Sequence, residues 1–225
     1  MPKVIKVAAM CSTNGTDLQT IVPFLQSGKI SAKIELIFAN TDCPAIEKAK
    51  KYGVKHIVVE SKGRESVDFH NEVIKIMHLY QIDLIILVGY MKILPESFVK
   101  EFKNKIINVH PSLLPKYPGM DSLNDVLKAR ETETGCTLHF VDQGVDSGPI
   151  IIQGRVQIKP GETHDSLKTK VQAKEMELYP KVIQWFVEDK IEINGKEVNH
   201  FRIFRNYVFS ICWTCKCCWL LCKWF

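Results

Sequence analysis

Residues 4–39 read VIKVAAMCSTNGTDLQTIVPFLQSGKISAKIELIFA, and this stretch decides the class of fold. Its two ends, residues 4–10 and 34–39, are short apolar runs of the kind that form buried β-strands. Residues 16–26, which lie between them, have the apolar spacing of a helix. A strand, a helix and a second strand in this order predict two parallel strands joined by a right-handed crossover, which is the repeating unit of an α/β fold.

The same alternation continues along the chain. It predicts strands at residues 56–59, 84–88 and 106–109, with helices at residues 45–52, 65–80 and 95–102. Beyond Pro111 the pattern changes, because residues 137–141 and 149–158 read as strands joined by a short polar loop. A last long helix is expected over residues 164–188, with Thr163 as its cap and a kink or interruption at Pro180. The sequence therefore predicts a mostly parallel sheet with an antiparallel C-terminal extension.

Composition and charge narrow the class of protein. Of the 225 residues, 46% are hydrophobic and 24% are charged, which predicts a globular protein and excludes disordered, fibrous and disulfide-framed classes. The net charge is +5, but residues 201–225 hold four basic residues and no acidic one, so residues 1–200 carry 5 − 4 = +1. We therefore expect no nucleic-acid partner. The absence of a signal-peptide pattern and the scattered cysteines Cys11, Cys43 and Cys136 favour a reduced, cytoplasmic setting without membrane contact.

Ligands of open parallel sheets bind beyond the carboxyl ends of the strands, so binding and catalytic residues are expected in the loops that follow the strands. Residues 11–18, CSTNGTDL, form a polar turn at the start of a helix, where backbone N–H groups could bind a phosphate. Taken alone, this turn fits better as an ordinary one with Thr16 or Asp17 as a cap. Residues 89–94, GYMKIL, could hold a flat aromatic ligand, although a core-lining turn is the simpler interpretation of that segment alone.

The strongest signal is in residues 108–119, NVHPSLLPKYPG. Positions two apart on a strand share a face, so Asn108 and His110 project together at the end of the sheet and offer an amide donor beside a titratable imidazole. Three prolines stiffen the segment that follows. A carboxylate to orient the imidazole could come from Asp142 or Asp146, although turn chemistry explains either residue equally well. The other histidines, including His139, are interpreted as structural or surface residues, and no metal site is expected in residues 1–200.

On these residues the chain resembles the glycinamide ribonucleotide formyltransferases, folate-dependent enzymes of purine synthesis that use 10-formyltetrahydrofolate. The resemblance spans about residues 4–190 and is most specific at residues 108–119, with support from residues 89–94, 139–153 and 172–180. It implies a Rossmann-like formyltransferase fold in a single domain over residues 1–200. It also implies small-molecule substrates, a cytoplasmic location and a monomeric or homodimeric enzyme.

The resemblance assigns roles to individual positions. It implies a catalytic trio of Asn108, His110 and Asp146, whose donors would stabilise the oxyanion formed when the substrate amine attacks the formyl group. It implies a phosphoribosyl site that consists of Gly15, Thr16, Asp17, Gln172, Ala173, Lys174 and Glu175. It implies a folate site that consists of Arg64, Met91, Lys92, Ile93, Leu94, Asn108, Asp142, Gln143, Gly144, Val145 and Asp146, with a pterin pocket of Leu87, Val99 and Ile106.

The chain departs from the family pattern at the substrate loops. Thr13 stands where the family usually has glycine, Asp17 where it usually has asparagine, and residues 120–123, MDSL, where relatives usually carry a histidine. A carboxylate beside a phosphate is unfavourable unless it turns away, so Asp17 is expected to affect substrate affinity.

Other functions share parts of this pattern. Methionyl-tRNA formyltransferase has the same Asn-x-His motif, but it normally adds a C-terminal domain for which this chain is too short. A formyltetrahydrofolate hydrolase shares the folate cleft and the trio, yet residues 11–18 look built for a phosphate-bearing acceptor. A non-catalytic folate or nucleotide binder is a further alternative, and the intact trio argues against it.

Residues 201–225 do not fit the rest of the chain. They contain Cys212, Cys215, Cys217, Cys218, Cys222 and three of the four tryptophans. The crowded cysteines give poor geometry for zinc, and Lys216 interrupts an apolar run already shorter than the roughly 20 residues that a membrane span requires. We interpret this tail as foreign to the fold.

Overall fold

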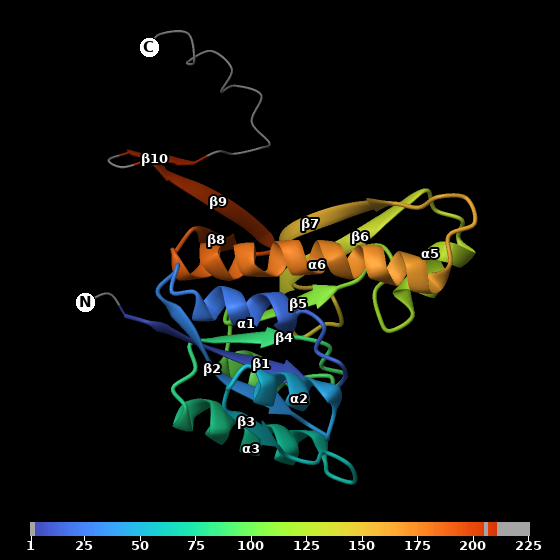
Figure 1. Ribbon diagram of the computed structural model, residues 1–225. Helices are drawn as coiled ribbons and strands as arrows, with labels where there is room; N and C mark the ends of the chain where they lie inside the picture. The colour runs from blue at the N-terminus through green and yellow to red at the C-terminus, as the bar shows by residue number, and fades with distance from the viewer. Residues whose placement is uncertain (1–2, 205–206, 211–225) are drawn as a thin grey trace.

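A computed structural model describes residues 3–204 and 207–210, and it shows a seven-stranded sheet covered by helices on both faces (Figure 1). The strand order is β3-β2-β1-β4-β5-β6-β7. The strands are β1 Ile5–Cys11, β2 Ala32–Ala39, β3 His56–Val58, β4 Leu84–Leu87, β5 Ile106–His110, β6 Glu133–Phe140 and β7 Ile150–Gln157. The helices are α1 Leu18–Gln26, α2 Pro44–Lys51, α3 Ser66–Leu79, α4 Glu96–Glu101, α5 Ser122–Lys128 and α6 His164–Val187.

The pairing of the strands confirms the predicted fold class. Strands β1 to β5 are mutually parallel where they pair, and β6 and β7 are added to β5 in antiparallel orientation. The chain moves outward from β1 to β3 and then returns to the other side of β1 with β4. The strand order therefore reverses between β1 and β4, and such a reversal opens a crevice at the carboxyl ends of the two strands.

Two hydrophobic clusters hold the helices to opposite faces of the sheet. Buried residues of α1, α2, α5 and α6 pack with Ile107 and Val7 on one face. Buried residues of α3 and α4 pack with Ile106 and Ala8 on the other. Ile106 and Ile107 are adjacent on β5 and belong to different clusters, as the alternation of a strand buried on both faces requires.

Helix α6 packs closely on the sheet and carries part of the site. Thr163 caps it as predicted, because its Oγ accepts the N–H of Ser166 at 3.2 Å while the Ser166 hydroxyl accepts the N–H of Thr163 at 3.1 Å. The helix continues through Pro180, so the predicted interruption is wrong; the buried residues on both sides of the proline hold the helix in place. The Tyr179 hydroxyl donates to the carbonyl of Leu87 at 2.7 Å and so fixes α6 against the end of β4.

The chain beyond α6 continues in a small antiparallel sheet. Its strands are β8 Ile191–Asn194, β9 Glu197–Phe204 and β10 Tyr207–Ser210, in the order β10-β9-β8. Strand β9 crosses the boundary at residue 200 where the sequence predicted the end of the domain. The five tail cysteines and the three tail tryptophans lie outside the described residues.

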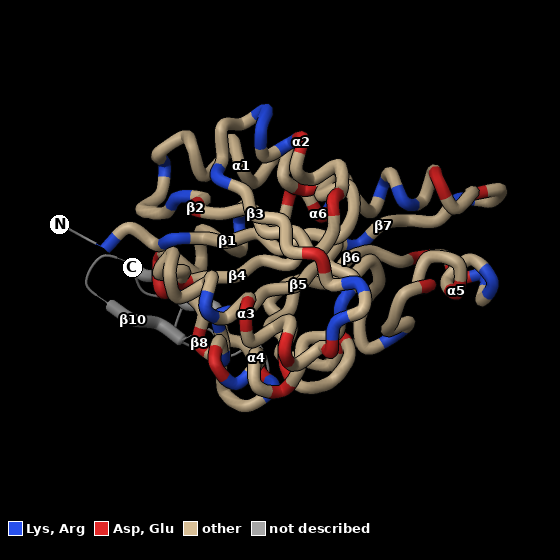
Figure 2. The backbone as a smooth tube through the Cα atoms, turned by 90° about the horizontal axis from the view of Figure 1, so that it is seen from below, with Lys and Arg blue, Asp and Glu red and all other residues tan. Residues whose placement is uncertain are grey.

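Basic and acidic residues are mixed along the described chain, and none of its helices could cross a membrane. Figure 2 shows Lys and Arg interspersed with Asp and Glu along the described chain, in keeping with the near-neutral charge of residues 1–200. None of the helices within residues 3–204 is long and apolar enough to span a bilayer. No group of three or more His, Cys, Asp or Glu in this part of the chain is arranged to hold a metal ion.

Candidate active site

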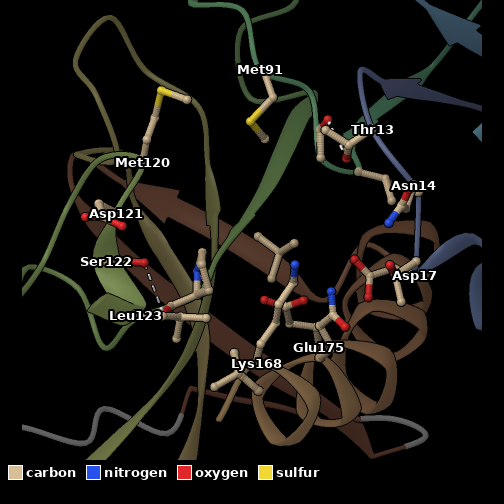
Figure 3. A pocket seen from close by; sticks show the side chains of 18 of the residues that line it. Thr13, Asn14, Asp17, Met91, Met120, Asp121, Ser122, Leu123, Lys168 and Glu175 are labelled. Atoms are coloured by element: carbon tan, nitrogen blue, oxygen red, sulfur yellow. Dashed lines mark hydrogen bonds between the residues drawn. The ribbon is translucent and has the colours of Figure 1, made fainter. Parts of the chain in front are cut away.

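A cavity of about 340 Å³ lies at the point where the strand order reverses. Its walls come from the loops after β1, β4 and β5, from residues 120–123 and from one face of α6 (Figure 3). Residues 13–17 form one wall, and the α6 residues facing them are His164, Lys168, Val171, Gln172 and Glu175. We call this cavity the acceptor pocket.

The loop of residues 13–17 offers the pocket unused backbone donors. Within the described chain, the N–H groups of Asn14, Gly15, Thr16 and Asp17 donate to no protein acceptor, and α1 begins directly after them. Gly15 has φ +57, and a Cβ atom there would lie 2.9 Å from the side chains of both Ala45 and Leu18. The tight turn thus requires glycine, and it presents N–H groups at a helix N-terminus, the arrangement that binds phosphate.

Two carboxyl groups face each other across the acceptor pocket. Asp17 is 4% exposed and Glu175 is 7% exposed, and Figure 3 shows both among the side chains that line the pocket. The Asp17 Oδ1 atom is buried without a hydrogen-bond partner. Burial raises the pKa of Asp17 to about 7 despite the attraction of Lys48, and burial together with the charge of Asp17 raises the pKa of Glu175 to about 8. Asp17 thus lines the pocket in which the sequence analysis expected it to affect substrate affinity.

The structure places most, but not all, of the predicted acceptor residues in the pocket. Gly15, Thr16, Asp17, Gln172 and Glu175 line it. Ala173 and Lys174 do not, because the helical period turns positions 173 and 174 away from positions 168, 171, 172 and 175. Ala173 is exposed, and the Lys174 Nζ atom lies 2.5 Å from Glu177. Sequence analysis missed Lys168 and His164. They precede Gln172 by four and eight residues, so the helical period places all three on one face of α6.

The predicted trio comes together at the end of β5, beside the acceptor pocket but facing the other side of the sheet. The His110 Nδ1 atom lies 3.2 Å from Asp146 Oδ2, and the Asn108 Nδ2 atom lies 3.4 Å from Asp146 Oδ1. Val109 and Pro111, which alternate with the trio along the chain, line the acceptor pocket instead. At the end of β5, the trio therefore lies on one face of the sheet and the acceptor pocket on the other.

A residue that sequence analysis classed as structural or surface, His139, contacts the trio directly. It is paired with Asn108 across β5 and β6, and its Nε2 atom lies 3.2 Å from Asn108 Nδ2. Its Nδ1 atom lies 2.8 Å from the carbonyl of Phe140, so a neutral ring donates there and accepts from the Asn108 amide. The 3.7 Å separation between His139 Nε2 and Asp146 Oδ1 is too long for a hydrogen bond. His139 therefore orients the amide of Asn108.

The His110 ring is held at both nitrogens. Its Nε2 atom lies 2.7 Å from the carbonyl of Tyr117, opposite the contact of Nδ1 with Asp146. Burial lowers the pKa of His110, because the charged ring would lose its water, while the Tyr117 carbonyl and the Asp146 carboxylate act to raise it. Asp146 thus favours the protonated ring, as expected from the sequence, but burial is the larger effect. The pKa of His110 in the ligand-free protein therefore lies below its ordinary value.

The loop of residues 142–148 uses its two aspartates differently. Asp142 braces the loop, because its Oδ1 accepts the N–H of Gly144 at 3.0 Å and the hydroxyl of Ser147 at 2.7 Å. Asp146 instead faces the trio and accepts the N–H of Gly119 at 2.9 Å. Burial acts to raise the pKa of Asp146, but the Gly119 N–H and the His110 ring beside it hold it below its usual value. Asp146 is therefore a carboxylate at neutral pH.

The segment after His110 is held rigidly by β6 and β7. The Ser112 hydroxyl donates to the carbonyl of Lys116 at 2.6 Å, and the Thr137 hydroxyl donates to the carbonyl of Ser112 at 2.7 Å. Gln153 on β7 donates to the carbonyl of Leu114 at 2.8 Å. These bonds fix the Tyr117 carbonyl and the Gly119 N–H, which in turn fix His110 and Asp146.

The predicted folate residues lie mainly outside the acceptor pocket. Of these residues only Met91 lines that pocket, and Met91, Ile93 and Val145 are exposed at 53%, 75% and 56%. Large exposed apolar side chains of this kind suit contact with a flat ligand. Lys92 and Leu94 are half-buried on the same loop, and Gln143 donates to Glu96 at 3.0 Å. Leu87, Val99 and Ile106 are buried.

Arg64 is already engaged within the protein. Its guanidinium lies 2.7 Å from Glu72 and 5.3 Å from the centre of the Phe69 ring. The structure thus shows Arg64 holding the start of α3, and no contact links it to the trio or to the acceptor pocket among the described residues.

Comparison with known proteins agrees with this geometry. The family described as formyl transferase matches residues 5–183. Phosphoribosylglycinamide formyltransferase of Haemophilus influenzae is 36% identical over 84% of this chain and 90% of that protein. The Escherichia coli protein of the same name is 32% identical over 84% and 91%. The solved structure of glycinamide ribonucleotide transformylase 1 from Symbiobacterium toebii has a TM-score of 0.84 at 32% identity, covering 86% of this chain and 92% of that one. The chain belongs to the formyl transferase family.

Proposed function

We propose that this protein transfers a formyl group from 10-formyltetrahydrofolate to the amine of glycinamide ribonucleotide. The observation that carries the proposal is the contact of Asn108, His110 and Asp146 at the end of β5, directly beside a pocket with unused backbone donors for a phosphate. The names of the relatives in the formyl transferase family support the same reaction.

The trio provides the groups that acyl transfer from the formyl donor needs. When the substrate amine attacks the formyl carbon, negative charge develops on the carbonyl oxygen and requires donors. The amide of Asn108 is oriented by His139 at 3.2 Å and donates its second N–H to Asp146 at 3.4 Å, and this weaker bond would give way to the oxyanion when the formyl donor binds. His110, with Asp146 at its Nδ1 atom, would supply the second donor and a proton for the leaving nitrogen once its Nε2 atom releases the Tyr117 carbonyl.

The two ligands would approach the trio from opposite faces of the sheet. The phosphoribosyl group fits the acceptor pocket, with its phosphate on the N–H groups of residues 14–17 and its sugar near Glu175. The formyl donor fits the other side, where Met91, Ile93 and Val145 expose apolar surface and Leu87, Val99 and Ile106 form the buried wall. The folate supplies the formyl group, and the protein contributes orientation and charge stabilisation.

The setting of the reaction belongs to the same proposal. We infer a cytoplasmic enzyme that acts on small molecules as a monomer or a homodimer, because the described cysteines Cys11, Cys43 and Cys136 are free and the charge is mixed. The trio and the acceptor pocket lie within residues 13–175. We therefore assign catalysis to residues 1–200 and no part of it to the tail.

One assay separates the candidate functions. The protein is incubated with 10-formyltetrahydrofolate, with and without glycinamide ribonucleotide, and both formate and formylated ribonucleotide are measured. Transfer requires the amine substrate and yields formylated product, whereas a hydrolase releases formate without it. The Asp146→Asn variant should lose the activity, and His78→Asn, which changes an exposed histidine paired with Glu101, serves as its control. Formate release at full rate without the amine, or no product at all, would exclude the proposed reaction.

A further inference from the structure

The two carboxyl groups in the acceptor pocket lack the partners that buried acids normally have. Neither Asp17 nor Glu175 receives a hydrogen bond from the described protein, and Asp17 Oδ1 is fully enclosed. Buried polar groups are almost always paired, so an unpaired one in a ligand pocket calls for an explanation. The residues come from the two opposite walls, the loop before α1 and the face of α6, and Figure 3 shows both among the side chains that line the pocket.

The surroundings of the pair contain little compensating charge. On the Asp17 side the charged neighbour is Lys48 of α2, whose ammonium is bound to the carbonyl of Asn14. On the Glu175 side it is Lys168, about two turns of α6 away along the pocket wall.

Three buried titratable neighbours remain uncharged. Burial raises the pKa of Cys11, Cys136 and Tyr179 well above neutral, so they stay protonated between pH 6 and 9. Asp121 and His164 also line the pocket, and His164 lies 3.2 Å from the exposed carboxylate of Asp165. Two adjacent buried carboxylates are therefore opposed by two lysines that are not hydrogen-bonded to them, and full ionisation of both is unfavourable.

We propose that Asp17 and Glu175 share a proton and that this proton determines how tightly the acceptor pocket binds its sugar phosphate. With the proton present, the pair offers one O–H donor and several acceptor lone pairs, which matches the mixed donor and acceptor character of sugar hydroxyls. Without it, two negative charges face a ligand that is itself an anion. This inference rests on the proposed function for the choice of ligand only.

The direction of the effect follows from proton linkage. Burial raises the pKa of Asp17 to about 7, and burial with the charge of Asp17 raises that of Glu175 to about 8, so the pair loses its protons just above neutral pH. If binding requires the shared proton, affinity falls by up to about tenfold for each pH unit above that range. A phosphate group has its second pKa at about 6, so the charge of the ligand hardly changes between pH 7 and 9.

The substitution Asp17→Asn tests the pair with little change in shape. A carboxamide is close in size and hydrogen-bonding capacity to a protonated carboxyl, but it cannot ionise. The variant should bind with the neutral-pH affinity of the parent protein and lose less affinity than the parent from pH 7 to 9, because one of the two titrating carboxyls is gone. Glu175→Gln should weaken the pH dependence in the same way, and only the double variant should be flat, because burial still raises the pKa of the carboxyl that each single variant keeps.

Two measurements on the full chain decide the question. Carboxyl 13C chemical shifts of the ligand-free protein, assigned by the two variants, should show two carboxyls that titrate above pH 6, one of which disappears in each variant. Calorimetric titration with ribose 5-phosphate should show affinity falling about tenfold or more between pH 7 and 9 in the parent protein and staying constant in the double variant. Ordinary titration of both carboxyls below pH 5 would overturn the shared proton, whatever the ligand.

The outcomes distinguish this inference from the proposed function. A titrating pair combined with pH-independent binding, or with no binding of ribose 5-phosphate at any pH, would overturn the role of the proton in affinity. A titrating pair with the expected loss of affinity, in a protein that transfers no formyl group, would leave the inference standing and remove the proposed reaction.

Discussion

Replacing Asp17 with asparagine should change the pH dependence of stability in a predictable direction. In an unfolded chain an aspartate ionises near pH 3.9, whereas in the folded protein burial raises the pKa of Asp17 to about 7. Between these values the folded protein holds the extra proton, so the free energy of unfolding falls as the pH rises. The contribution of Asp17 is therefore complete below about pH 4 and is lost as the pH passes 7.

The size of the effect follows from the pKa shift. A shift of roughly three units at about 1.4 kcal/mol each sets an upper limit of about 4 kcal/mol, of which roughly 3 kcal/mol is lost between pH 5 and pH 8. Water entry and relaxation around the charge reduce that value. The Asp17→Asn variant has no such loss, so its stability relative to the parent protein should increase by up to about 3 kcal/mol over this range.

Urea unfolding at pH 5 and pH 8, with and without the substitution, measures the difference. The control is Asp83→Asn, because Asp83 accepts the N–H of Lys6 at 3.0 Å and has a pKa that its partners hold below the usual value despite partial burial. Both of its pKa values lie below pH 5, so this substitution should cost the same stability at both pH values. Parallel behaviour of the Asp17→Asn variant and the parent protein would refute the assignment of a buried, protonated Asp17.

Four further predictions concern the trio, the sheet and the tail. Asn108→Ala should fold normally and lose roughly 10²–10³-fold in kcat, because the substitution removes a proposed donor to the oxyanion. Steady-state kinetics measures the loss, and circular dichroism checks the fold. Asp146→Asn should lose about 10²-fold or more in kcat, because the protonated form of His110 loses the carboxylate that stabilises it. Its unfolding midpoint should not change, because asparagine tolerates the φ of +51 at this position. A kcat near that of the parent would contradict this prediction. Gly154→Val should destabilise the protein by about 1–3 kcal/mol in urea unfolding, because even a Cβ atom would lie 2.3 Å from Lys174 and 2.8 Å from Leu178. The control is Gly28→Ala, which has open space at its Cβ but a φ of +67 and so measures the cost of backbone strain alone. Deleting residues 201–225 should leave formyl transfer unchanged, as measured by kcat and KM, and a loss of transfer would show that the small C-terminal sheet supports the site.

The sequence predicted the parallel half of the sheet well because buried parallel strands are continuous apolar runs. Strands β1 to β5 begin and end within two residues of the predicted positions. Strand β6 begins four residues earlier than predicted, at Glu133, because residues 133–136 include Gly135 and lack an apolar run. Helix α5 was not predicted, since its seven residues bury only Ser122, Leu123 and Val126 and offer too few turns for a periodic signal.

The site was predicted where it depends on neighbours in sequence and missed where it depends on packing. Asn108 and His110 are two residues apart on one strand, so their common face follows from the strand period. The choice of Asp146 over Asp142 required the resemblance to known enzymes. The contact of His139 with Asn108 depends on the register between β5 and β6, and the approach of Glu175 to Asp17 depends on how α6 docks. Neither register nor docking is written in the local pattern of residues.

The acceptor pocket draws its walls from the first loop of the fold and from its last long helix, which also contacts α1 directly. A ligand that contacts both walls links the two ends of the domain reversibly. At a hundredfold excess over its dissociation constant, such a ligand raises the free energy of every opening in which α6 detaches by about 2.7 kcal/mol. Amide hydrogen exchange along α6 should therefore slow as the pocket fills, so the protection of this one helix reports how much of the enzyme is loaded with acceptor.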